Sequence, residues 1–391
     1  MNASRPYDGI RIIDLARELG SYATRLFADL GAEVIRVELP EGGDDRRNPP
    51  QSPSGNGIAF EYLNLNKHSV VVDYRQEAGR QILRDLVGSA QVVVYEDDVL
   101  RDALLPLFAE PPSARVVTVI SYFGLTGPYG GYLGSDLVAQ AAGGLAWLSG
   151  DPNGPPLRIA GEQGCFVTSL YAATATAMAL WDTERKGASH MLDIAAQECL
   201  AHSLQNTLEA YSLEGRVTRR GGEGTRDATE NIFACRDGYV FLAAPLQLTS
   251  AWSGLLLWLK DSGHPGGMRL SEPEWREPKS RATQKLHAEF RRIFESFTAD
   301  KTKNELLDAA LARKILLSPV STIVDTLSDT QLRHRDFFRT VHHTAFGRDI
   351  AIPGAPYRFS EPVWSVARAA PAPGQDNAVF LGDRAGREDG R

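Results

Sequence analysis

The chain has 391 residues, of which 43% are hydrophobic and 23% charged, and its formal net charge at pH 7 is −7. These proportions are typical of a globular protein, and the length exceeds what one hydrophobic core usually organises, so we expect two domains. The acidic balance excludes a general attraction to nucleic acid or to anionic membranes. No signal peptide and no apolar run long enough to span a bilayer is found, and we expect a cytoplasmic protein.

Cysteine and histidine patterns point away from metal. Cys165, Cys199 and Cys235 are widely spaced and form no CxxC pair, and the eight histidines form no HxxxH or HExxH group. The sequence therefore predicts neither a disulfide framework nor a metal site.

The first part of the chain alternates short apolar runs with amphipathic ones. The predicted strands and helices are Ile10–Leu15, Tyr22–Leu30, Glu33–Glu38, Val70–Asp73, Gln76–Val87, Gln91–Tyr95 and Arg115–Ser121. Strands that alternate with helices indicate parallel βαβ units and a doubly wound α/β domain. The turn after the first strand lacks GxGxxG, which disfavours a dinucleotide site with Glu38 as the ribose ligand.

A long helix is expected in the middle of the chain. The polar loop holding Glu162 precedes an Ala-rich run without Pro or Gly, which predicts a buried helix that begins near Cys165. Arg185 and Lys186, followed by Gly187, are typical of a helix end, and His190–Ile194 then reads as a strand. A shorter helix is expected before it, over Asp136–Leu148.

The later part is predicted to be a smaller unit. A helix over Gln197–Tyr211 leads to the basic, Gly-rich segment Gly215–Gly224, and a strand follows Asp237-Gly238. Three helices are then expected over Leu248–Lys260, Arg281–Phe297 and Lys301–Leu311.

Several segments resemble the class III CoA-transferase family, which includes formyl-CoA transferase, carnitine CoA-transferase and the 2-methylacyl-CoA racemases. They are Asp29–Glu38, Gly134–Leu145, Arg185–Gly187 and Pro371–Asp376, and the similarity covers roughly residues 8–383. The resemblance implies a Rossmann-like large domain (1–195 plus 345–391), a linker (196–224), a small α/β domain (225–344) and an interlocked, ring-like homodimer.

The resemblance also implies an activity. The protein is expected to act on acyl-CoA thioesters and a carboxylic acid or other acyl acceptor, with coenzyme A as a substrate and no permanently bound cofactor. In transferases of the family an Asp just before the central helix attacks the thioester, and Cys165 stands at that place. A carboxylate can form first an anhydride and then an enzyme–CoA thioester. A thiol cannot form the second intermediate, because joining it to the CoA sulfur would give a disulfide.

Four readings of this position stay open. Cys165 transfers an acyl group to another nucleophile or to water, with a helix N-terminus favouring its thiolate. Glu162 is the attacking carboxylate, although a shift of three residues moves the oxygen by several ångströms. Cys165 is a small buried hydrophobe without chemistry. The chain is a non-catalytic subunit that forms a hetero-oligomer with an Asp-bearing relative.

The resemblance places further residues near CoA. Asn66, Lys67 and His68 match a phrase whose basic residues face the CoA phosphates, against the alternative of a plain turn with an exposed Lys. Arg47 lies either in a loop near CoA or in a solvated loop with one local ion pair. Glu96–Asp98 would repel a polyanion unless the carboxylates turn away.

Two other positions carry a functional and a structural interpretation. Asp136 is a substrate-side carboxylate or, with Ser135, part of a helix N-cap, which is the interpretation that we favour. Gly221 and Gly222 form a mobile lid over the active site or belong to an ordinary linker.

Overall fold

The computed structural model describes residues 5–53, 55–97, 116–151, 153–220, 226–343 and 346–382. The chain divides into two compact units: unit 1 comprises residues 1–149, 156–214 and 333–391, and unit 2 comprises residues 150–155 and 215–332. Residues 196–214, which the sequence analysis assigned to a linker, thus belong to the large unit.

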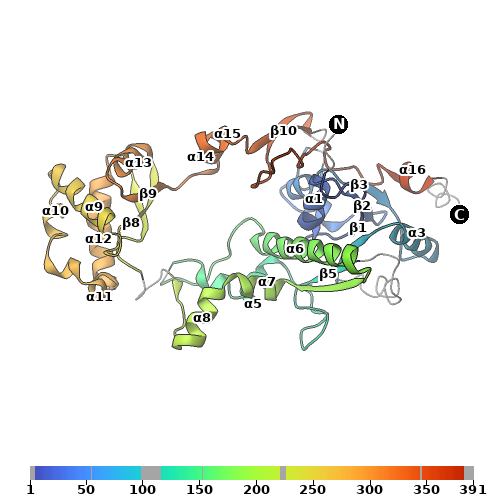
Figure 1. Ribbon diagram of the computed structural model, residues 1–391, viewed down its shortest axis with the longest axis horizontal. Helices are drawn as coiled ribbons and strands as arrows, with labels where there is room; N and C mark the ends of the chain where they lie inside the picture. Colours follow the sequence, from blue (N-terminus) through green and yellow to red (C-terminus); the bar gives the residue numbers. More distant parts are fainter. Residues whose placement is uncertain are drawn as a thin grey trace. The chain divides into compact units, whose positions relative to one another are not determined.

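A six-stranded parallel sheet forms the centre of unit 1 (Figure 1). Its strands are β1 (Arg11–Leu15), β2 (Glu33–Glu38), β3 (His68–Val71), β4 (Val92–Glu96), β5 (Val116–Ser121) and β6 (His190–Ala195). They follow the order β3-β2-β1-β4-β5-β6, which is the order of the doubly wound nucleotide-binding fold. The predicted α/β fold is confirmed.

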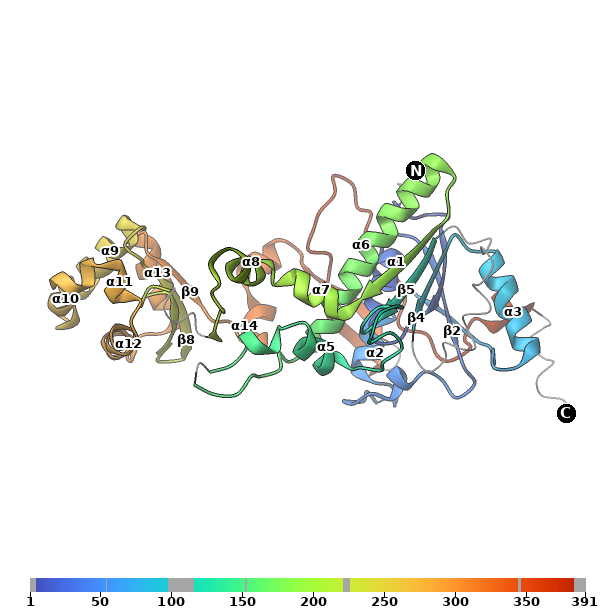
Figure 2. The same cartoon turned by 90° about the horizontal axis from the view of Figure 1, so that it is seen from below.

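Helices cover both faces of this sheet. The helices of unit 1 are α1 (Ser21–Asp29), α2 (Ile58–Leu63), α3 (Glu77–Gly88), α5 (Asp136–Ala142), α6 (Gln163–Lys186), α7 (Ala196–Ser203), α8 (Gln205–Glu214) and α16 (Asn377–Phe380), with 3-10 turns η1 (Asp44–Arg47) and η2 (Ala146–Leu148). One core joins α1, α5, α6 and α7 to the sheet, and a second joins α3 and the α16 segment to its other face. Figure 2 shows α3 and α6 on opposite sides of the strands.

The long central helix is α6, which begins two residues before Cys165. Glu162 precedes it in the left-handed region at φ 56°, and Gly187 ends it at φ 70°. By length and composition alone α6 could cross a membrane. We had found no apolar run of that length in the sequence. Half of the 18-residue apolar window of α6 is buried inside the chain. The buried side of α6 packs in the core that it shares with α1 and the sheet, through Cys165, Ala172, Ala179 and Leu180.

Two predicted helices are interrupted. The helix expected over Asp136–Leu148 is divided into α5 and η2, because the chain turns at Gly143 and at Gly144, whose φ is +86°. The helix expected over Gln197–Tyr211 is divided into α7 and α8 at Leu204.

Unit 2 contains a three-stranded antiparallel sheet of β7 (Asn231–Cys235), β8 (Gly238–Ala243) and β9 (Leu316–Pro319). Its helices are α9 (Thr249–Asp261), α10 (Gly266–Arg269), α11 (Pro278–Arg281), α12 (Gln284–Thr298), α13 (Lys303–Ala312) and α14 (Ile323–Ser328), with the 3-10 turn η4 (Pro273–Arg276). Helix α15 (Thr330–His334) spans the boundary, and the hairpin β10 (Phe338–His343) and β11 (Arg348–Pro353) returns the chain to unit 1.

Candidate functional site

A cleft of about 570 Å³ opens in unit 1 beside the start of α6. It lies between the loop that follows β1, the η1 loop, helices α1 and α2, and the first turn of α6. Cys165 and Glu162 both line it. Ligands of open parallel sheets bind at the carboxyl ends of the strands, and the loop after β1 is at that edge.

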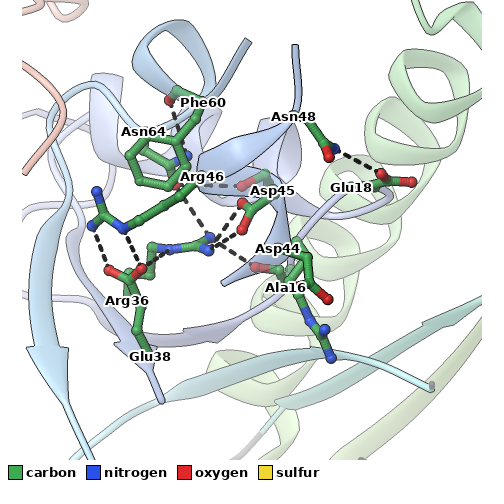
Figure 3. A network of polar contacts seen from close by, with 12 residues as sticks. Ala16, Glu18, Arg36, Glu38, Asp44, Asp45, Arg46, Asn48, Phe60 and Asn64 are labelled. Atoms are coloured by element: carbon green, nitrogen blue, oxygen red, sulfur yellow. Dashed lines mark hydrogen bonds and ion pairs between the residues drawn. The ribbon is translucent and has the colours of Figure 1, made fainter. Parts of the chain in front are cut away.

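The wall formed by the η1 loop is fastened to β2 by buried ion pairs, as Figure 3 shows. Arg36 donates two hydrogen bonds to Asp45, at 2.8 and 2.9 Å, and Arg46 donates to both oxygens of Glu38, at 2.5 and 2.6 Å. Burial alone would raise the pKa of Glu38, but Arg36 and Arg46 outweigh it and lower that pKa to about 2. Sequence reasoning missed this network, since partners eight or nine residues apart carry no recognisable motif.

Arg47 lies outside this network. Its side chain is exposed and donates to the backbone oxygen of Glu41, at 2.7 Å, and to the carboxylate of Asp44, at 3.1 Å. This arrangement is a solvated loop with one local ion pair. The neighbouring Arg46 is the buried residue of this loop.

Lys67 does not face a ligand, contrary to our expectation. It is fully buried, and its Nζ donates to Asp14 Oδ2 at 2.8 Å and to the backbone oxygen of Ser21 at 2.9 Å. Burial lowers the pKa of Lys67, while Asp14 favours its charged form. Lys67 therefore joins β3 to β1 and to the start of α1, and a phosphate contact from this conformation is excluded.

Asn66 and His68 contact the end of the chain. Asn66 adopts φ 64°, donates to Asp29 and to the backbone oxygen of Ser365 at 2.7 Å each, and accepts from two backbone N–H groups. His68 Nδ1 lies 2.6 Å from Arg368 and 3.2 Å from Asp376. Both residues hold the C-terminal segment of unit 1 against the segment before β3 and β3 itself, and neither lines the cleft.

The acidic segment at the end of β4 turns inward. Glu96 is buried and accepts hydrogen bonds from the backbone N–H groups of Arg17, at 2.6 Å, and Gly20, at 3.0 Å. Asp97 is also buried, and Asp98 lies outside the described residues. Glu96 thus holds the loop after β1 through two backbone N–H groups and does not line the cleft, although its charge still contributes to raising the pKa of Cys165.

Asp136 connects the two helices nearest the cleft. Ser135, not Asp136, is the N-cap of α5, and the buried Asp136 instead accepts a 3.1 Å hydrogen bond from the backbone N–H of Cys165. Its other oxygen accepts from Gln140 at 2.7 Å. A Cβ at Gly164 would lie 2.8 Å from Asp136 Oδ1, so the first turn of α6 needs a glycine there.

The thiol of Cys165 is in surroundings that oppose ionisation. Cys165 is 6% exposed. Its burial is the main reason that the pKa of the thiol lies far above the ordinary value, and the negative charge of Asp136 is the second. The expected effect of the helix N-terminus on a thiolate is therefore overridden. At neutral pH this cysteine carries its proton and is a poor nucleophile.

Glu162 presents the exposed carboxylate of the cleft entrance. Possible ligand atoms of Asp136, Glu162 and Cys165 all lie within 4.8 Å of one another. Arg158 lies 2.6 Å from Glu162 and 3.5 Å from Asp136, so a guanidinium already balances both carboxylates. The group is thus an ion-paired cluster around a neutral thiol. Gly221 and Gly222 lie outside the described residues.

These features define a doubly wound α/β protein with a ligand cleft at the carboxyl edge of its sheet and carboxylates around the first turn of its central helix. The chain belongs to CoA-transferase family III, whose model matches residues 7–377. Named relatives of the chain are CoA-transferases, and the family supports a class III CoA-transferase-like function.

Two relatives and one solved structure illustrate the similarity. The chain is 33% identical to the succinyl-CoA:(R)-benzylsuccinate CoA-transferase subunit BbsE of Thauera aromatica, over 96% of this chain and 93% of the relative. It is 30% identical to the succinate–glutarate CoA-transferase of Agrobacterium fabrum, over 85% and 84%. A CAIB/BAIF family protein from Brucella suis superposes with a TM-score of 0.83 at 26% identity, covering 98% of this chain and all of that one.

Proposed function

We propose that this chain is one subunit of a two-subunit class III CoA-transferase, in which a related, Asp-bearing chain supplies the nucleophilic carboxylate. The observation that carries the proposal is the burial of Cys165, whose backbone N–H is bonded to Asp136, at the place where the sequence resemblance puts the family's Asp. Burial and the charge of Asp136 raise the pKa of its thiol. The T. aromatica relative is itself named as a subunit, which supports the same division of roles. Coenzyme A then enters and leaves as a substrate, with no resident cofactor.

The proposed assembly is a dimer of two chains of this fold. Exposed apolar side chains on two helices of unit 1 support it, since such surfaces usually contact a partner. They are Leu170, Met178 and Trp181 of α6 and Leu208, Tyr211 and Leu213 of α8. Size-exclusion light scattering measures the mass of the assembly. The chain alone should run at twice its own mass if it forms a homodimer. If it pairs only with an Asp-bearing relative, it should run as a monomer alone and reach twice that mass in the mixture.

Intact-mass spectrometry after incubation with acyl-CoAs tests the missing nucleophile. The wild-type chain should gain no mass. Cys165→Asp should gain the mass of one CoA less one water, because its carboxylate can attack the thioester and then form a thioester with the released CoA, while the acyl group leaves as a free carboxylate. Cys199→Asp, at another buried cysteine, is the matched control and should stay unlabelled. An acyl adduct on the wild type that disappears in Cys165→Ala would contradict the proposal and make Cys165 a nucleophile.

A second candidate function is favoured by the position of Glu162. This residue lines the cleft, has an exposed carboxylate within 4.8 Å of the other two groups of the cluster, and adopts a φ of 56° that is uncommon for a side chain of its type. Glu162 would then be the family carboxylate, displaced by one turn. A CoA adduct on the wild type that is lost in Glu162→Gln but kept in Cys165→Ala would establish this function instead.

A further inference from the structure

The inner wall of the 570 Å³ cleft is aromatic. Tyr22 of α1, Phe60 and Tyr62 of α2 and Phe166 of α6 all line it. The Tyr22 ring stands edge-on to the Phe166 ring, with centroids 5.0 Å apart, and lies nearly parallel to the Tyr62 ring, at 6.4 Å. Tyr22, Tyr62 and Phe166 thus form one connected surface built from three helices, and Phe60 lines the cleft two residues before Tyr62 on α2.

The aromatic wall is held in place from behind. The guanidinium of Arg46 covers Phe60 at 4.1 Å, and that of Arg25 covers Tyr62 at 4.0 Å. Arg46 is itself bonded to Glu38, so the ring of Phe60 is tied to the buried network of Figure 3. Burial raises the pKa of Tyr22 to about 12, so this ring stays neutral. Rings fixed in this way form a preorganised surface for a flat ligand.

The charges of the cleft disfavour a ligand that ends in a carboxylate. Among the described residues that line it, Arg17 is the one cation, and Glu18, Asp45 and Glu162 carry three carboxylates. Asn48 donates to Glu18 at 3.0 Å, so that acid is held at the rim. Asp45 and Glu162 are already paired, with Arg36 and Arg158. The carboxylate of a succinyl group would therefore compete with them for those cations, whereas a neutral ring would meet rings, prolines and aliphatic side chains.

We propose that this cleft binds the aromatic ring of an aryl-substituted acyl group, non-covalently and beside Cys165. The inference rests on the proposed function for the nature of its ligand, a CoA thioester. It does not depend on which group attacks the thioester. The cleft volume is within the range of about 300–1,000 Å³ that is usual for small-molecule sites.

Titration calorimetry with matched thioesters tests the inference on the wild-type chain. 3-Phenylpropionyl-CoA should bind at least about fivefold more tightly than hexanoyl-CoA, which lacks the ring, and more tightly than succinyl-CoA and free CoA. Equal affinities for the phenyl and hexanoyl thioesters, or for the phenyl thioester and free CoA, would overturn it. Because binding is measured without turnover, this outcome is separate from the adduct experiment that tests the proposed function.

Two variants locate the ring. Ala59→Trp, at an exposed position of α2 that lines the cleft, should fill the space and remove the preference for the phenyl thioester. Phe166→Ala should reduce that preference several-fold, whereas Tyr239→Ala, at an exposed aromatic residue of β8, should leave it unchanged. An unchanged preference in Ala59→Trp, with the variant folded by circular dichroism, would place the ring elsewhere and refute the assignment.

Discussion

The carboxylate of Asp136 accepts a hydrogen bond from the backbone N–H of Cys165, at 3.1 Å, at the first turn of α6. It satisfies one of the free N–H groups of a helix start and at the same time brings a negative charge close to the Cys165 thiol. The contact that orders the helix therefore also suppresses the thiolate.

The first prediction concerns thiol reactivity. Cys165 should react with iodoacetamide at pH 8 far more slowly than the less buried Cys235, as measured by peptide mass spectrometry over time. Asp136→Asn, which removes the charge but keeps an oxygen acceptor, should accelerate labelling of Cys165 and leave Cys199 unchanged. Fast labelling of Cys165 in the wild type would show that the thiol is exposed and ionised after all.

The second prediction concerns Lys67. Lys67→Met leaves the charge of Asp14 buried without its partner, so the free energy of unfolding should fall by about 3–5 kcal/mol in urea titrations. The control, Lys186→Met, removes a largely exposed ion pair with Asp182 and should cost less than about 1 kcal/mol. Affinity for CoA per folded molecule should be unchanged in Lys67→Met. A selective loss of CoA binding without loss of stability would return Lys67 to the ligand site.

The third prediction concerns the pH dependence that Glu38 creates. Its folded pKa of about 2 lies below the ordinary 4.5, so the folded protein binds fewer protons than the unfolded chain between these values. The stabilisation, about 3 kcal/mol, is complete above about pH 4.5 and is lost as the pH falls towards 2. Glu38→Gln should lower stability at pH 7 and flatten the profile over this interval, whereas the exposed Glu77→Gln should alter it little. A wild-type profile that is flat from pH 5 to 3 would contradict the prediction.

The fourth prediction concerns Gly43. A Cβ at this position would lie 2.3 Å from Asp45 Oδ1 and 2.9 Å from an Arg36 nitrogen, so Gly43→Ala should break the pair that holds the η1 loop. We expect a lower melting temperature and faster proteolysis of that loop, with no such change in Asp44→Ala at the exposed neighbour. If Gly43→Ala melts at the wild-type temperature, the loop tolerates loss of this ion pair.

Local patterns in the chain predicted most of unit 1. Buried parallel strands read as continuous apolar runs, and α6 is marked by an Ala-rich segment between a polar loop and Gly187, so both were visible without any tertiary information. The helix breaks at Gly143-Gly144 and Leu204 were missed, because the apolar pattern continues across them. The family followed from short segments spread along the chain, and the matched model confirms it.

What the sequence by itself determined was the layered α/β fold, the start of the central helix and the substitution at Cys165. Only the tertiary structure decided what these residues meet. Lys67 and Asp14 are 53 residues apart, and Cys165 and Asp136 are 29 apart, yet each pair is in contact. Burial and neighbouring charge set the ionisation of a lysine or a thiol, and both depend on segments that the local sequence does not contain. The same holds for the aromatic cleft, whose rings come from three separate helices.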